Sequence, residues 1–85
     1  MDKETINLLS FVKSSKYRVK ILVFIGKQTK IPSEIAKEIN LSNTHTSKYL
    51  KSLKEKQLIK CLNEEAKRGR LYQLTDKGKE IVKEL

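Results

Sequence analysis

Residues 41–59 read LSNTHTSKYLKSLKEKQLI, and this stretch predicts a tight turn followed by an amphipathic helix. Ser42 suits the N-cap of a helix from Asn43 to about Gln57, because its hydroxyl can accept a hydrogen bond from a free amide of the first turn. On a helical wheel, side chains that suit a core gather on one side: Thr46, Tyr49, Leu50 and Leu53. The side chains that point the opposite way are polar: Thr44, Lys48, Lys51 and Glu55. The helix therefore has one face for a core and one for solvent or a partner.

Two helices are predicted N-terminal to this unit. Residues 3–13 form the first, with Ile6 and Leu9 on the face that we expect to be buried. Residues 16–25 form the second, which is apolar nearly all round and is therefore expected to be the most buried helix. Gly26 follows it directly and suits its C-cap, because glycine adopts positive φ angles easily.

A third helix is predicted to begin at Pro32, because the missing N–H of proline needs no partner in a first helical turn. Its inner face consists of three apolar side chains: Ile35, Ala36 and Ile39. Residues 40–42 then form the turn that leads into the helix at Asn43. Two helices joined by so short a turn form a helix-turn-helix unit.

The last third of the chain changes to an alternating pattern. Residues 59–63 and 71–75 have strand periodicity, and the polar segment 64–70 between them suits a hairpin loop. We expect Tyr72 and Leu74 to pack this hairpin onto the helices.

A final helix is predicted after Thr75, which suits its N-cap. The inner stripe of this helix consists of small and apolar residues: Gly78, Ile81, Val82 and Leu85. The predicted fold class is mostly α with a small β-hairpin (α+β), with three to five helices. We expect residues 1–85 to form a single domain, because 85 residues are too few for two.

The charge balance favours a polyanionic partner. The chain has 19 Lys and Arg against 10 Asp and Glu, which gives a formal net charge of +9. A charge that serves only solubility is the alternative. No signal peptide is visible, and the longest apolar run, residues 21–25, is far too short for a membrane span. These features predict a cytoplasmic protein.

The residues that carry catalysis or bind metals are largely missing from the sequence. Cys61 is the only cysteine, so neither an intramolecular disulfide nor a multi-cysteine metal cluster can form. His45 is the only histidine, and no partner nucleophile or carboxylate is indicated for it. The chain also has no nucleophile elbow and no phosphate loop. We therefore predict no enzymatic activity, no catalytic residue, no metal site and no cofactor, with Cys61 as a half-buried strand thiol.

The outer face of the helix at Asn43 has the side chains that DNA recognition needs. The first turns of a recognition helix reach base edges in the major groove, and five polar residues fall there: Asn43, Thr44, His45, Ser47 and Lys48. Lys51 lies further along and suits a phosphate, and four other basic residues are candidates for the same role: Lys16, Arg18, Lys20 and Lys30. The alternative is an ordinary amphipathic surface helix, whose outer face has a similar composition.

A second basic group lies in the predicted hairpin loop. Lys67, Arg68 and Arg70 surround Gly69, which allows a tight turn. An arginine head is flat and weakly hydrated, so it suits the negative potential of a narrow minor groove. The alternative is a solvated turn, because hairpin tips are often charged.

The ordered set of motifs resembles ArsR- and MarR-type winged helix-turn-helix regulators, especially short archaeal ones. The similar segments are residues 41–59, the helix start PSEIA at 32–36 and the stretch RGRLYQLTDKG at 68–78. The resemblance covers about residues 17–85. It departs at Gln57, where such proteins usually have glycine, and at Thr46, where valine is common. The cysteine cluster of the metal-sensing members is also missing.

The resemblance implies a winged-helix fold, sequence-selective binding of double-stranded DNA and a homodimer. By position it gives the base-reading role to residues 43–48 except Thr46, and the wing role to Lys67, Arg68 and Arg70. We expect a transcriptional regulator of the repressor type that dimerises through its first and last helices, and no small-molecule ligand is indicated. The alternative is a winged-helix module that docks proteins within a larger transcription or chromatin assembly.

Overall fold

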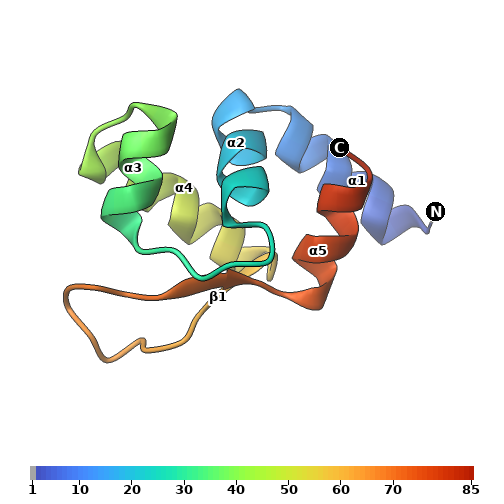
Figure 1. The fold of residues 1–85 in the computed structure, drawn as a ribbon. Coiled ribbons are helices and arrows are strands. Elements are labelled where there is room, and N and C mark those ends of the chain that lie inside the picture. Colours follow the sequence, from blue (N-terminus) through green and yellow to red (C-terminus); the bar gives the residue numbers. More distant parts are fainter. Residues whose placement is uncertain (1) are drawn as a thin grey trace.

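The computed structural model describes residues 2–85 and contains every predicted helix and both strands (Figure 1). The helices are α1 (Lys3–Lys13), α2 (Lys16–Ile25), α3 (Pro32–Ile39), α4 (Asn43–Glu55) and α5 (Asp76–Lys83). The strands are β1 (Ile59–Cys61) and β2 (Tyr72–Leu74), which pair antiparallel. Helix α4 stops at Glu55 rather than near Gln57. Both strands are shorter than the predicted ranges 59–63 and 71–75, so the loop between them is longer than expected. Over residues 2–85, no helix has the length and apolarity needed to cross a membrane.

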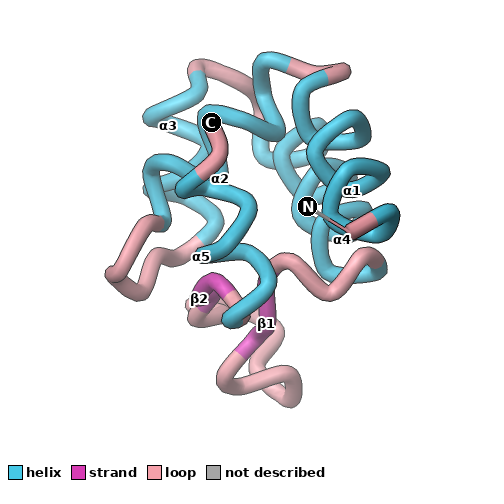
Figure 2. The backbone as a smooth tube through the Cα atoms, turned by 90° about the vertical axis from the view of Figure 1, so that its right-hand side faces the viewer, coloured by secondary structure: helices cyan, strands magenta, loops and turns pink. Residues whose placement is uncertain are grey.

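The helices surround a small core, and the hairpin lies along one side of it (Figure 2). At one end of the molecule α1 and α5 pack against each other, and the hairpin loop projects from the other end (Figure 1). A backbone bridge attaches a third segment to the hairpin: Lys30 N donates to Tyr72 O at 3.0 Å, and Tyr72 N donates to Lys30 O at 2.8 Å. The start of β2, next to the hairpin loop, is therefore held by the segment that leads directly into α3.

The core is centred on α2, as its apolar composition predicts. Ile21, Leu22 and Ile25 are completely buried, and α2 packs against the four other helices and β2. Val23, on the uncovered side of α2, remains 55% exposed. Tyr72 and Leu74 are buried, which confirms that these two residues pack the hairpin onto the helices.

The predicted inner face of α1 is wrong at one position. Ile6 is 50% exposed, and Thr5 is buried instead, together with Leu8, Leu9 and Val12. The Thr5 hydroxyl accepts a hydrogen bond of 2.8 Å from Lys77 Nζ of α5. A polar side chain can occupy this buried position because its oxygen has a partner.

The last helix follows the prediction only over its first two turns. Thr75 Oγ1 accepts from Gly78 N at 3.0 Å, and Gly78 and Ile81 are buried. Val82 is half-buried, and Leu85 lies beyond the helix and is 38% exposed. The predicted inner stripe therefore loses contact with the core toward the C-terminus.

The end of α4 has the backbone geometry that glycine usually supplies. Gln57 has a φ of 60°, Gln57 N donates to Lys54 O at 2.9 Å, and Leu58 N donates to Leu53 O at 3.0 Å. These are the two hydrogen bonds of a Schellman C-cap. The turn at Gln57, where the similar regulators usually have glycine, therefore has ordinary C-cap geometry with a strained residue in it.

We expect Gln57→Gly to stabilise the protein by roughly 0.5–1 kcal/mol, because the left-handed conformation is unfavourable for a residue with a Cβ. The measurement is the midpoint of urea unfolding at an unchanged m-value. Asn40→Gly is the matched control, since Asn40 ends α3 with a φ of 58° and asparagine tolerates this conformation better. A larger gain for Asn40→Gly than for Gln57→Gly would contradict this explanation.

Candidate nucleic-acid interface

The outer face of α4 is built as the helical wheel predicts. Thr46, Leu50 and Leu53 are buried, and Tyr49 is half-buried. All the residues predicted to contact DNA from this helix are exposed: Asn43, Thr44, His45, Ser47, Lys48 and Lys51. Because the buried residues hold the helix against the core, the exposed ones are free to contact a partner.

The first turn of α4 is fixed by its cap. Ser42 Oγ accepts a hydrogen bond of 3.2 Å from His45 N, and the His45 ring nitrogen Nδ1 lies 2.9 Å from the same oxygen. Thr46 Oγ1 donates to Ser42 O at 2.8 Å. The imidazole of His45 is therefore held at the start of the helix, where the free amides and the helix dipole favour an anion.

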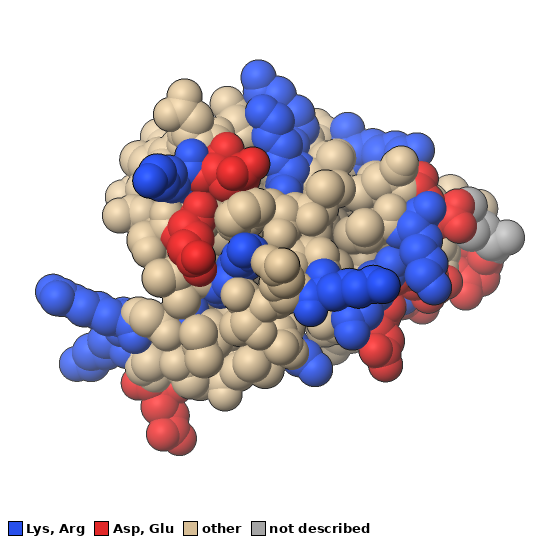
Figure 3. All heavy atoms as spheres, viewed as in Figure 1, with Lys and Arg blue, Asp and Glu red and all other residues tan. Residues whose placement is uncertain are grey.

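A groove of about 810 Å³ separates α4 and the start of α3 from the hairpin loop. Besides Tyr72, eight of its lining residues are polar or basic and come from both walls: Ser33, Asn43, Ser47, Lys51, Lys54, Lys67, Arg68 and Arg70. Figure 3 shows Lys and Arg side chains at the free end of the hairpin, below the notch that divides it from the helices. The structure thus brings the two predicted basic groups to opposite sides of one groove.

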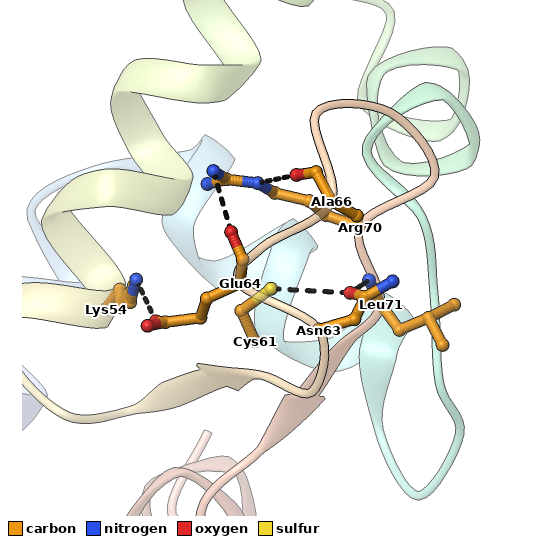
Figure 4. Close-up of polar contacts among 7 residues, drawn as sticks. All are labelled: Lys54, Cys61, Asn63, Glu64, Ala66, Arg70 and Leu71. Atoms are coloured by element: carbon orange, nitrogen blue, oxygen red, sulfur yellow. Dashed lines mark hydrogen bonds and ion pairs between the residues drawn. The ribbon is translucent and has the colours of Figure 1, made fainter.

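The three basic residues of the hairpin loop have different surroundings. Lys67 and Arg68 are exposed, whereas Arg70 is half-buried. Arg70 Nε donates to Ala66 O at 2.8 Å, and Arg70 Nη2 donates to Glu64 O at 3.2 Å (Figure 4). Interaction with the Tyr72 hydroxyl raises the pKa of the Arg70 guanidinium above its ordinary value. Arg70 thus binds the loop in which it lies.

Asn63 is a second residue that holds the loop, and the sequence analysis missed it. Asn63 Oδ1 accepts from Leu71 N at 2.7 Å and lies 3.6 Å from Cys61 Sγ (Figure 4). Asn63 Nδ2 donates to Gly69 O at 3.2 Å. An asparagine at the end of a predicted strand, next to a polar loop, is a usable signal, because its short amide often bonds to nearby backbone. Cys61 is half-buried, as predicted.

An ion pair joins α4 to the base of the loop. Lys54 Nζ, in the last turn of α4, contacts the Glu64 carboxylate. The hydrogen bond from Lys54 lowers the pKa of Glu64 below its ordinary value of 4.5, and the same bond raises the pKa of Lys54. Because the Glu64 pKa is lowered, the ion pair is present above pH 4.5 and is lost as the pH falls through the lowered value.

Comparison with protein families identifies the family to which this arrangement of helices and strands belongs. A family profile described as winged helix-turn-helix matches residues 13–85. The chain belongs to the winged helix-turn-helix family. In the vocabulary of this family, α3 and α4 form the helix-turn-helix, and α4 is called the recognition helix. The hairpin is called the wing, and the loop 62–71 is its tip. The predicted fold and the resemblance to this class of regulators are confirmed. Membership of this family of regulators also bears out the prediction that the chain is not an enzyme.

Solved structures with this winged-helix arrangement include ZitR from Lactococcus lactis, at 30% identity and a TM-score of 0.72, where 82% of this chain and 49% of ZitR are covered. A MepR–DNA complex from Staphylococcus aureus gives 19% identity and a TM-score of 0.76, over 96% of this chain and 69% of MepR. The homodimeric winged helix-turn-helix DNA-binding domain of Mb0332 from Mycobacterium bovis gives 17% identity and a TM-score of 0.68, over 93% and 69%. The chain thus spans about half the length of ZitR. Comparison with curated proteins finds no match.

Two of the basic residues expected to serve phosphates are engaged elsewhere in the winged helix. The Arg18 guanidinium lies 4.0 Å from the centre of the Phe11 ring and donates to Phe11 O and Ser14 Oγ at 3.0 and 2.9 Å. Lys30 Nζ lies 4.6 Å from the centre of the Phe24 ring. Arg18 therefore caps the C-terminus of α1 and holds it against α2. Within residues 2–85, no group of three or more His, Cys, Asp or Glu is placed to hold a metal.

Proposed function

We propose that this protein is a sequence-selective regulator of transcription that binds double-stranded DNA. The observation that carries the proposal is the groove with the exposed recognition helix on one side and basic wing residues on the other. The fold similarity to MepR, which was solved in complex with DNA, supports this proposal. The net charge of +9 supports it as well, because DNA is a dense polyanion.

The proposed contacts follow from which side chains are free. The first turns of the recognition helix enter the major groove with five base-reading residues: Asn43, Thr44, His45, Ser47 and Lys48. Asn43 suits a bidentate contact with adenine, and Lys48 suits the acceptors of guanine. Lys51 lies along the groove wall and binds a phosphate. Lys67 and Arg68 contact the adjacent minor groove or backbone from the wing.

A homodimer is the proposed functional unit, formed through α1 and α5. These helices pack side by side and leave apolar groups uncovered, with Ile6 at 50% and Leu85 at 38% exposure and Val82 half-buried. The domain of Mb0332 is described as homodimeric, which supports a dimer here. Two recognition helices would then meet half-sites about 34–36 Å apart. We propose repression as the outcome, because occupying a promoter needs no further contact with the transcription machinery.

The test is a titration of duplex DNA at several salt concentrations, followed by selection of bound duplexes from a random pool. We expect the logarithm of the affinity to fall with the logarithm of the salt concentration, by nearly one unit per phosphate neutralised. We expect the selected sequences to form a palindrome. A slope near zero would refute DNA binding, and bound sequences without any common motif would refute sequence selectivity.

A second candidate function is a module that docks proteins within a transcription or chromatin assembly. The exposed apolar pair on the wing favours it, since Leu62 is 49% and Leu71 37% exposed and the two are joined by a hydrogen bond of 2.8 Å from Leu62 N to Leu71 O. This candidate predicts weak DNA binding without sequence preference and a stable complex with a protein. The pool selection described above separates the two functions.

A further inference from the structure

Arg68 and Arg70 lie on either side of Gly69, yet their side chains are placed to do different work. We propose that Arg70 and Asn63 are positioning residues that hold the wing tip in one conformation, so that Lys67 and Arg68 alone of the wing's basic residues contact DNA. This inference rests on the proposed function. It reassigns Arg70, which the sequence motif groups with the DNA contacts.

The hydrogen bonds of Arg70 use the shape of its guanidinium group. Nε donates to the carbonyl oxygen of Ala66 at 2.8 Å, and Nη2 donates to that of Glu64 at 3.2 Å. One side chain therefore holds two backbone positions of the loop together. Hydrogen bonds from a charged donor are stronger than those between neutral groups. A lysine has a similar charge but lacks the planar fork, so it cannot reproduce the pair.

Asn63 closes the loop at the position where the strand pairing ends. The last backbone bond across the hairpin runs from Leu62 N to Leu71 O at 2.8 Å. Just beyond it, Asn63 Oδ1 accepts from Leu71 N at 2.7 Å, and Asn63 Nδ2 donates to Gly69 O at 3.2 Å. The side chain of Asn63 therefore replaces backbone pairing across the two sides of the loop.

The Lys54–Glu64 ion pair then sets the position of the loop relative to the recognition helix. Glu64 is held from two sides, since its carboxylate contacts Lys54 and its carbonyl oxygen accepts from Arg70 (Figure 4). Lys67 and Arg68 project from a loop that is fixed at its base and closed across its middle. Binding then has less conformational entropy to remove from the loop, because its conformation is already set.

The first experiment is a mutant cycle on duplex affinity, with Arg68→Ala as the reference for a direct contact. We expect Arg68→Ala to weaken binding by roughly 5- to 150-fold, and Arg70→Ala to weaken it as well. In a Lys67→Ala/Arg68→Ala background, adding Arg70→Ala should change the affinity by less than about twofold, because there is no wing contact left to position. An equal loss in both backgrounds would mean that Arg70 contacts DNA itself and would overturn the proposal.

The conservative variants separate charge from geometry. Arg70→Lys keeps the charge but loses the fork, so we expect it to bind DNA as weakly as Arg70→Ala. Asn63→Ala changes no charge and should give a loss in the same direction. Wild-type affinity in Arg70→Lys would show that charge alone matters at this position, and the proposal would be wrong.

The second experiment uses the free protein, so it does not depend on DNA binding. Amide hydrogen exchange by NMR should show faster exchange of Leu71 N–H in Asn63→Ala, with the Leu74 amide unchanged. In the wild type, the Nε–H of Arg70 should exchange more slowly than that of Arg68. Equal exchange at the two arginines, or an unchanged Leu71 amide, would overturn the positioning role. If these results hold but the wild type binds no duplex, the proposed function fails while the account of the loop stands.

Discussion

Gly78→Ala is expected to lower the free energy of unfolding by about 2–3 kcal/mol, although alanine is the better helix former by about 1 kcal/mol. A Cβ at position 78 would overlap the carbonyl oxygen of Leu58 and come within 3.4 Å of Leu74 Cβ. The Leu58 carbonyl cannot move freely, because it accepts a hydrogen bond of 3.1 Å from Thr75 N. Helix α5 must therefore shift away from the hairpin and lose packing, which outweighs the gain in helix propensity.

The measurement for Gly78→Ala is urea unfolding of the wild type and the variant at the same protein concentration. Lys79→Ala is the matched control, since residue 79 is the exposed neighbour in the same helix and its substitution should change stability by less than about 0.5 kcal/mol. A Gly78→Ala variant as stable as the wild type would mean that α5 is not seated closely on the Leu58 carbonyl.

The double charge reversal Lys48→Glu/Lys51→Glu is expected to reduce duplex affinity by at least about 100-fold near 0.1 M salt. Both side chains are exposed on the recognition helix, so the variant should fold normally. Each reversal removes an attraction to DNA and adds a like-charge repulsion, and such juxtapositions cost several kcal/mol. A 100-fold loss corresponds to about 2.7 kcal/mol.

The control for this prediction carries the same change in net charge at another place. Lys27→Glu/Lys79→Glu alters two exposed lysines that lie near Gln73, away from the groove between the recognition helix and the wing. We expect it to lose much less affinity, and only through the long-range field, which salt screens. Equal losses in the two variants at 0.15 M salt would refute a specific role for the recognition helix.

The order of the elements was predictable because each boundary carries a local signal. Pro32 at a helix start, and Ser42 and Thr75 at N-caps, act within one turn of their own position, and the structure has all three where expected. The inner face of α1 was not predictable in the same way. Its apolar residues lie on more than half of the helical wheel, so the wheel alone does not determine whether Thr5 or Ile6 is buried. The burial of Thr5 depends on a tertiary contact, the hydrogen bond from Lys77.

The helical part of the interface could be predicted from the sequence, whereas the irregular loop could not. In a helix, exposure follows from the period, so the free residues of α4 were identified correctly. In the loop 62–71, the direction of a side chain depends on the local backbone, which is set by contacts such as those of Asn63 and Arg70. The contact of Arg18 with Phe11 was not predicted for a related reason, since the two residues lie in different helices.

The backbone bridge between Lys30 and Tyr72 has a consequence for how such a protein can change. The wing and the helix-turn-helix are joined by main-chain atoms, and main-chain hydrogen bonds do not depend on which side chains the residues carry. The outward residues of α4, such as Thr44 and Ser47, contribute nothing to the core. A new preference for a DNA sequence can therefore arise by substitution of a few surface residues, while the core and the contact between wing and helices stay the same.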